Sequence, residues 1–165
     1  MDFVLSAWLF AGAVTVHNLE EAVLLPAWSK TAGRWHAPVG VREFRFAVTV
    51  LTVLAYVAVW AAIDYGRESL VAYLLSGYAL AMLLNVLIPH SLATVILRQY
   101  APGTLTALLL NLPASILLLH QAFTEGYIHF QRFVWAGPLV VAGIMLSIPL
   151  LFAVGRRFPG FKDSF

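Results

Sequence analysis

The sequence contains no cysteine and few charged residues. The absence of cysteine excludes disulfide bonds, thiolate metal sites and cysteine nucleophiles. Only 11% of the 165 residues are charged, whereas about 25% is usual for a soluble domain. Hydrophobic residues make up 61% of the chain, and its mean hydropathy is +0.86. This composition predicts an all-α integral membrane protein.

Five apolar segments, joined by short polar links, follow one another along the chain. Each is near the ~20 residues that a helix needs to cross the hydrocarbon core of a bilayer. They cover residues 3–27, 44–64, 69–98, 103–123 and 134–155. No stretch has the composition of a separate soluble module, so we expect a single five-span transmembrane domain over residues 1–165. Pro89 lies inside the third segment and predicts a kink there.

The basic residues are divided unevenly between the two sides of such a bundle. One side has only Arg67 and Arg132. The other side collects Lys30, Arg34, Arg42, Arg45, Arg98, Arg156, Arg157 and Lys162. By the positive-inside rule that second side is cytoplasmic, which places the N-terminus outside and the C-terminus in the cytoplasm. We expect a lipid bilayer, the bacterial inner (plasma) membrane, as the setting, with no nucleic-acid partner and with a homodimer left open.

The first apolar segment contains three ionisable side chains, those of His17, Glu20 and Glu21. A charged side chain near the middle of a spanning helix costs roughly 2.5–3.5 kcal/mol, so such residues usually have partners and a function. Residues three and four apart share one face of a helix, and His17 stands three residues from Glu20 and four from Glu21. The three side chains are therefore predicted to converge on one site.

Polar residues of later segments fall at a similar depth. With a helical rise of about 1.5 Å per residue, His90 lies about 12 Å and Asn85 about 19 Å from Arg98. Asn111 lies about 12 Å from Gly103 by the same measure. Asn85 and His90 are about 140° apart on a regular helix, so both face His17 only if Pro89 distorts the helix. Otherwise each polar residue is expected to make only an interhelical hydrogen bond.

Three stretches of the sequence carry a resemblance to a known family. They are His17-Asn18-Leu19-Glu20-Glu21, the element from Asn85 to Pro89-His90, and Tyr100-Ala101-Pro102-Gly103-Thr104-Leu105-Thr106. Together they resemble the HXXEE-domain integral membrane proteins, and the resemblance extends from the first segment to the fourth. It implies a functional set and specifies no reaction. That set is His17, Glu20, Glu21, Asn85 and His90.

Imidazole and carboxylate groups together are the ligand chemistry of Zn²⁺, Fe²⁺ and Mn²⁺. We predict a divalent metal, zinc before iron or manganese, with His17, Glu20, Glu21 and His90 as ligands. Glu20, Glu21 and Asn85 are the predicted catalytic residues, one glutamate acting as a ligand and the other as a general base. Asn85 is expected to donate a hydrogen bond to a developing oxyanion, and Asn111 to orient a histidine from outside the ligand set. A metal that activates water predicts hydrolysis. The depth of the site predicts that the substrate is a lipid or another membrane-soluble molecule.

Two other functions remain open at this point. Two adjacent carboxylates and a histidine can also act without a metal, as an acid–base isomerase or cyclase of an isoprenoid or sterol-like lipid. The same residues could instead bind an ion or metal in transit, as intramembrane carboxylates do in transport proteins. Five spans without an internal repeat fit an alternating-access carrier poorly unless the chain dimerises.

Overall fold

The computed structural model describes residues 1–33 and 37–157, apart from the side chain of Pro89, and this part of the chain contains helices and no strand. Three spans contain α1 (Phe3–Ser29), α2 (Val41–Tyr65) and α7 (Phe130–Gly155). The third span joins α3 (Leu70–Asn85), η2 (Val86–Ser91) and α4 (Leu92–Leu97). The fourth joins α5 (Thr104–Thr106), η3 (Ala107–Asn111) and α6 (Leu112–Thr124).

The prediction of five spans is confirmed. Five helices are long and apolar enough to cross a membrane, which is consistent with an integral membrane protein. Their boundaries differ little from the expected ones: α1 continues through Pro26 to Ser29, and α7 begins at Phe130, four residues before the predicted start. The predicted cytoplasmic residues Arg34 and Lys162, and His36 in the first link, lie outside the described residues.

Polar side chains cap the first turn of two of the spans. The side chain of Asp2 precedes α1 and accepts a hydrogen bond from the backbone N–H of Leu5 at 2.8 Å. Ser69 has the same role before α3, where its hydroxyl accepts from the N–H of Ala72 at 3.2 Å. Each cap satisfies a backbone donor that the first helical turn leaves without a partner.

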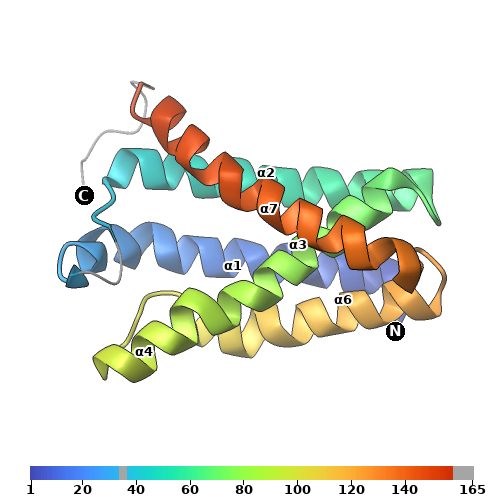
Figure 1. The fold of residues 1–165 in the computed structure, drawn as a ribbon, viewed down its shortest axis with the longest axis horizontal. Coiled ribbons are helices and arrows are strands. Elements are labelled where there is room, and N and C mark those ends of the chain that lie inside the picture. The colour runs from blue at the N-terminus through green and yellow to red at the C-terminus, as the bar shows by residue number, and fades with distance from the viewer. Residues whose placement is uncertain (34–36, 158–165) are drawn as a thin grey trace.

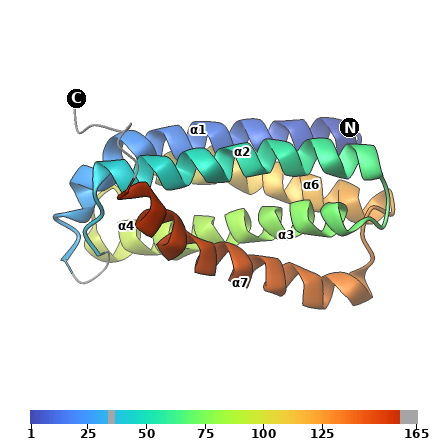
Figure 2. The same ribbon diagram turned by 90° about the horizontal axis from the view of Figure 1, so that it is seen from above.

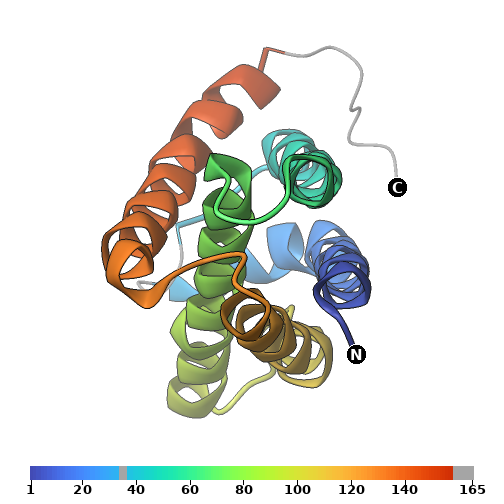
Figure 3. The same cartoon turned by 90° about the vertical axis from the view of Figure 1, so that its right-hand side faces the viewer.

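The α3 helix runs through the middle of the bundle (Figure 3). It contacts α2, α6 and α7, while α1 packs against α2 and α6 (Figure 1). Large side chains fill the space between these helices, and the fully buried ones include Phe3, Phe10, Val59, Leu75 and Leu118. The α7 helix lies on the outside, against α3 and α2 (Figure 2).

The described members of the two groups of basic residues lie at opposite ends of the bundle. The end of α1, the start of α2 and the ends of α4 and α7 are together at one end, and the N-terminus is at the other (Figures 1 and 2). Arg67, between α2 and α3, and Arg132, in the first turn of α7, belong to the N-terminal end. The bundle thus has one basic end, and the orientation of that end toward the cytoplasm stays a prediction.

The third span is broken where Pro89 predicts it. Ile88 has φ −132° and ψ 119°, which is the extended conformation preferred by a residue that precedes proline. The helical residues before and after Ile88 therefore meet at a kink. Because of this break, Asn85 and His90 no longer have the angular separation of a regular helix, and both can face α1.

Candidate metal centre

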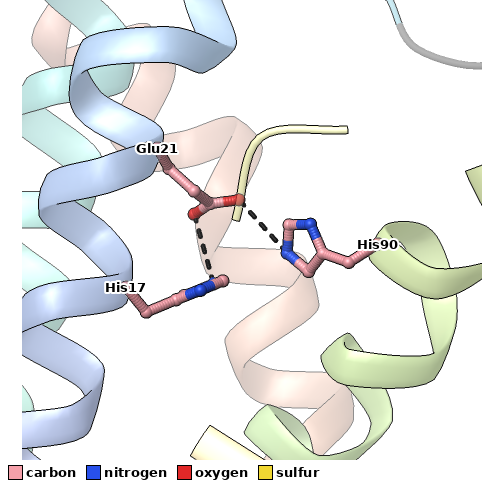
Figure 4. A group of neighbouring side chains, drawn as sticks. All are labelled: His17, Glu21 and His90. Carbon is pink, nitrogen blue, oxygen red and sulfur yellow. Dashed lines mark ion pairs between the residues drawn. The ribbon is translucent and has the colours of Figure 1, made fainter. Parts of the chain in front are cut away.

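The side chains of His17, Glu21 and His90 meet inside the bundle (Figure 4). The α1 helix supplies His17 and Glu21, and η2 supplies His90. The two carboxylate oxygens of Glu21 face different rings: Oε2 lies 3.6 Å from His17 Nε2, and Oε1 lies 3.3 Å from His90 Nε2. The histidine side chains are 0% and 2% exposed, and that of Glu21 is 13% exposed. One potential ligand atom from each residue lies within 4.8 Å of the other two.

The spacing of these atoms suits a metal ion. Zinc binds nitrogen and carboxylate oxygen at about 2.0–2.1 Å, so neighbouring ligands of a tetrahedral site are about 3.3–3.4 Å apart. A direct N–H···O hydrogen bond would bring the two atoms to about 2.7–3.2 Å. The observed 3.3 and 3.6 Å separations are close to the ligand spacing and longer than a usual hydrogen bond. Two imidazoles and a carboxylate are suitable ligands for a divalent cation, each imidazole lies near one oxygen of Glu21, and one ligand atom from each residue lies within 4.8 Å of the others.

Asn85 completes the group from the last turn of α3. Its amide nitrogen Nδ2 lies 3.2 Å from His17 Nε2 and 3.1 Å from His90 Nε2. The amide can donate one hydrogen to each ring nitrogen, provided that both nitrogens carry lone pairs. Each of these lone pairs can bind either an amide hydrogen or a metal, so Asn85 would give up these two bonds to a bound cation. Asn85 thus lies beside both histidines, an arrangement that the sequence allowed only if Pro89 distorts the helix.

The contact made by the second ring nitrogen of His17 indicates which of its two nitrogens carries the hydrogen. His17 Nδ1 lies 3.0 Å from the hydroxyl oxygen of Thr106. The single hydroxyl hydrogen of Thr106 goes to an acceptor, either Glu20 Oε2 at 2.7 Å or the carbonyl of Gly103 at 3.2 Å. Nδ1 of His17 must then donate to Thr106, which leaves the lone pair on Nε2. That tautomer directs the metal-binding nitrogen toward Glu21 and His90.

Glu20 lies next to Glu21 in the sequence but has different partners. Its Oε1 accepts from the backbone N–H of Gly103 at 2.9 Å and from the hydroxyl of Tyr100, and its Oε2 accepts from Thr106. The sequence analysis assigned Glu20 to the metal ligands and to catalysis. In the structure the potential ligand group contains Glu21 and not Glu20, and Glu20 binds the segment between the third and fourth spans.

The chain matches, over residues 8–118, the family described as "Protein of unknown function with HXXEE motif". The chain belongs to the HXXEE family. The uncharacterized protein YrkK of Bacillus subtilis (strain 168) is 40% identical over 149 residues, which cover 90% of this chain and 94% of YrkK. No solved structure matches the chain. The family resemblance drawn from the sequence is confirmed, and His17, Glu20 and Glu21 are the His and Glu positions of the HXXEE motif.

The segment from Tyr100 to Thr106 covers this HXXEE site. Gly103 has φ +88°, and a Cβ atom there would lie 2.7 Å from Cε1 of His90 and 2.8 Å from Cε1 of His17. Only glycine has both the required conformation and the required size. Partial burial and the hydrogen bond to Glu20 raise the pKa of the Tyr100 phenol, so it remains a donor. Sequence reasoning treated this segment as a turn and missed Thr106, although the segment itself was part of the family resemblance.

Asn111, at the end of η3, lies outside the group of potential metal ligands. Its side chain is fully buried, and neither amide atom hydrogen-bonds to another described residue. The predicted contact from Asn111 to a histidine is therefore absent from the described part of the chain. Ser76 and Ser115 are likewise buried with a hydroxyl that lacks a partner there.

Proposed function

We propose that this HXXEE protein is a metalloenzyme of the bacterial inner membrane that hydrolyses a lipid or another membrane-soluble molecule. His17, Glu21 and His90 hold a divalent cation in this proposal. The observation that carries it is the convergence of three potential ligand atoms, one from each residue, within 4.8 Å of one another. The concentration of basic residues at one end supports an orientation with that end, and the C-terminus, in the cytoplasm.

Zinc is the cation that we expect first. Catalytic zinc sites commonly have three protein ligands and one open position, and two histidines with one carboxylate are a frequent set. Iron and manganese accept the same ligand types, so the identity of the metal is decided by measurement. When bound, the cation would supply Lewis-acid activation of water or of a substrate carbonyl.

The residues around the ligands have separate tasks. Thr106 accepts from His17 Nδ1 and so holds the ring in the tautomer that binds through Nε2. Asn85 lies beside both ring nitrogens, and once a cation takes their lone pairs its amide hydrogens would be available to stabilise negative charge that develops on a substrate oxygen. Glu20, which accepts from three donors, is a positioning residue and leaves the ligand role to Glu21.

A lipid-like substrate agrees with the position of the site. His17 and Glu21 lie inside a 27-residue apolar helix, and the neighbouring η2 and α5 belong to other spans. Of the three ligand residues, Glu21 is the most exposed. The depth of Glu21 within these spans supports a substrate that is soluble in the membrane.

Metal analysis of the purified, untagged protein tests the proposal. We expect about one equivalent of metal in the wild type, as in a single three-ligand site, and little in His17→Ala or Glu21→Gln. Glu20→Gln is the matched comparison, since it changes the neighbouring carboxylate in the same way outside the ligand group. It should still retain metal, with an affinity lowered only through the bonds of Glu20 to the segment between the third and fourth spans. Equal metal in the wild type and in folded His17→Ala would contradict the proposal.

The activity requires a second measurement. The metal identified in this way should support hydrolysis of ester-containing lipids by the wild type and not by Glu21→Gln. If folded wild type takes up no metal even when metal is supplied, the metal-free isomerase becomes the better explanation. Proton exchange into isoprenoid lipids would then be the assay.

A further inference from the structure

A second site lies on the opposite face of α1 from the metal centre. It is a groove of about 500 Å³ between α1 and α2, within the size range of small-molecule sites. Thr15, Leu19 and Val23 line it at intervals of four residues, and His17 and Glu21 are each two residues further along. Two residues correspond to about 200° around a helix, so the groove and the metal centre face away from each other.

Arg45 is the one charged residue that lines this groove. Its Nε donates to the backbone carbonyl of Ala22 at 3.2 Å, a bond that crosses from α2 to α1 and fixes the guanidinium at the end of the groove. Among the described residues, no carboxylate forms an ion pair with Arg45. The two terminal amino groups of the guanidinium therefore remain as hydrogen-bond donors for a ligand.

The other polar groups of the groove are already bonded within the protein. The amide of Asn18 donates to Thr52 Oγ1 at 2.7 Å. The hydroxyl of Thr15 donates to the carbonyl of Ala11 at 2.8 Å, and that of Thr49 donates to the carbonyl of Arg45 at 2.7 Å. What the groove offers a ligand is thus an apolar wall that ends at a single cation.

We propose that this groove binds an anionic phospholipid, with the phosphate at Arg45 and an acyl chain along the wall. Arg45 lies near the start of α2, at the basic end of the bundle, where a headgroup would be. From Val23 to Thr15 the groove follows α1 for about 12 Å toward the bilayer centre. An acidic lipid has a negatively charged headgroup and an apolar chain, which suit the cation at one end of the groove and the apolar wall beyond it. A guanidinium can donate two parallel hydrogen bonds to the oxygens of a phosphate. The inference does not depend on metal binding or hydrolysis.

The test compares two lipids with identical acyl chains, phosphatidylglycerol and phosphatidylcholine, by native mass spectrometry of the full chain in detergent. One arginine near an acidic headgroup contributes about a fivefold preference, so the wild type should retain phosphatidylglycerol about five times better. Arg45→Gln should abolish this preference. Arg98→Gln, an exposed arginine at the end of α4 on the same end of the bundle, is the matched control and should keep it.

A second variant tests the groove without changing charge. Val53 is 55% exposed on the groove wall, and Val53→Trp should fill the groove and lower retention of both lipids. Helical circular dichroism and elution volume report whether each variant is folded. Equal retention of the two lipids by the wild type overturns the proposal, as does an unchanged preference in Arg45→Gln. An equal loss in Arg98→Gln assigns the preference to diffuse charge and also overturns it. Conversion of a wild-type dimer to a monomer by Val53→Trp, without a lipid preference, would assign the groove to a second copy of the chain.

Discussion

Replacing Thr106 by valine is the sharpest test of how the metal centre is held. The change keeps the shape of the side chain and removes one hydroxyl. That hydroxyl lies 3.0 Å from His17 Nδ1 and 2.7 Å from Glu20 Oε2, so both groups lose a partner at once. The Nδ1–H of His17 would lose the acceptor that the Thr106 hydroxyl provides, and with it the bond that fixes the tautomer of the ring.

We expect Thr106→Val to bind the metal more weakly than the wild type. Loss of a group that orients a metal-binding histidine typically weakens binding about 10- to 100-fold, which corresponds to about 1.4–2.7 kcal/mol. Competition with a chelator of known affinity, in detergent, measures the zinc dissociation constant of each variant. Thr106→Ser keeps the hydroxyl and should bind nearly as well as the wild type.

A matched control separates this effect from the general cost of replacing a threonine. Thr15 lies on the other face of α1, and its hydroxyl bonds to the carbonyl of Ala11. Thr15→Val should leave zinc affinity unchanged. If Thr106→Val binds zinc as tightly as Thr15→Val, the orientation of His17 does not depend on Thr106 and the reasoning is refuted.

Two further predictions concern the covering segment. Gly103→Ala should lower the melting temperature and zinc retention, because a Cβ there meets both imidazoles in addition to about 1–2 kcal/mol of left-handed strain. Gly126→Ala, at φ +73° with open space around its Cβ position, carries the strain alone, and an equal effect of the two changes would contradict the predicted clash. Tyr100→Phe should destabilise the protein by roughly 1 kcal/mol at neutral pH, through loss of the bond to Glu20. Because the folded state raises the pKa of Tyr100, its contribution is full below the unfolded value of about 10 and is lost as pH rises through the higher folded value. The melting difference between wild type and Tyr100→Phe should therefore be constant near neutrality and shrink at alkaline pH, and a difference that persists there would count against the bond.

The apolar runs were sufficient to predict the five spans, because a bilayer requires about 20 such residues in succession. The positions of His17 and Glu21 on one face also follow from helical spacing alone. The meeting of Asn85 with His90 does not follow in this way, since it depends on the extended conformation at Ile88. A proline indicates that a helix is distorted, but the direction of the distortion depends on how the neighbouring spans pack.

The sequence could not predict which of the two glutamates, Glu20 or Glu21, faces the histidines. Adjacent residues on a helix point about 100° apart, so a motif with two consecutive glutamates leaves open which one meets the histidines. The answer depends on where the fourth span begins, because Gly103 and Thr106 provide the donors that bind Glu20. A threonine in an apolar helix gives no signal of its own, as it usually bonds to its own backbone.

The adjacency of Glu20 and Glu21 couples two parts of the molecule. Both belong to one rigid turn of α1, yet one carboxylate faces the histidines and the other holds the segment that starts the fourth span. A cation bound to Glu21 would stabilise this turn of α1. It would thereby also favour the position of the segment that Glu20 holds. By reciprocity, the bonds of Glu20 to that segment would raise cation affinity by the same factor, so cation binding at Glu21 and the position of the segment at Glu20 would be coupled.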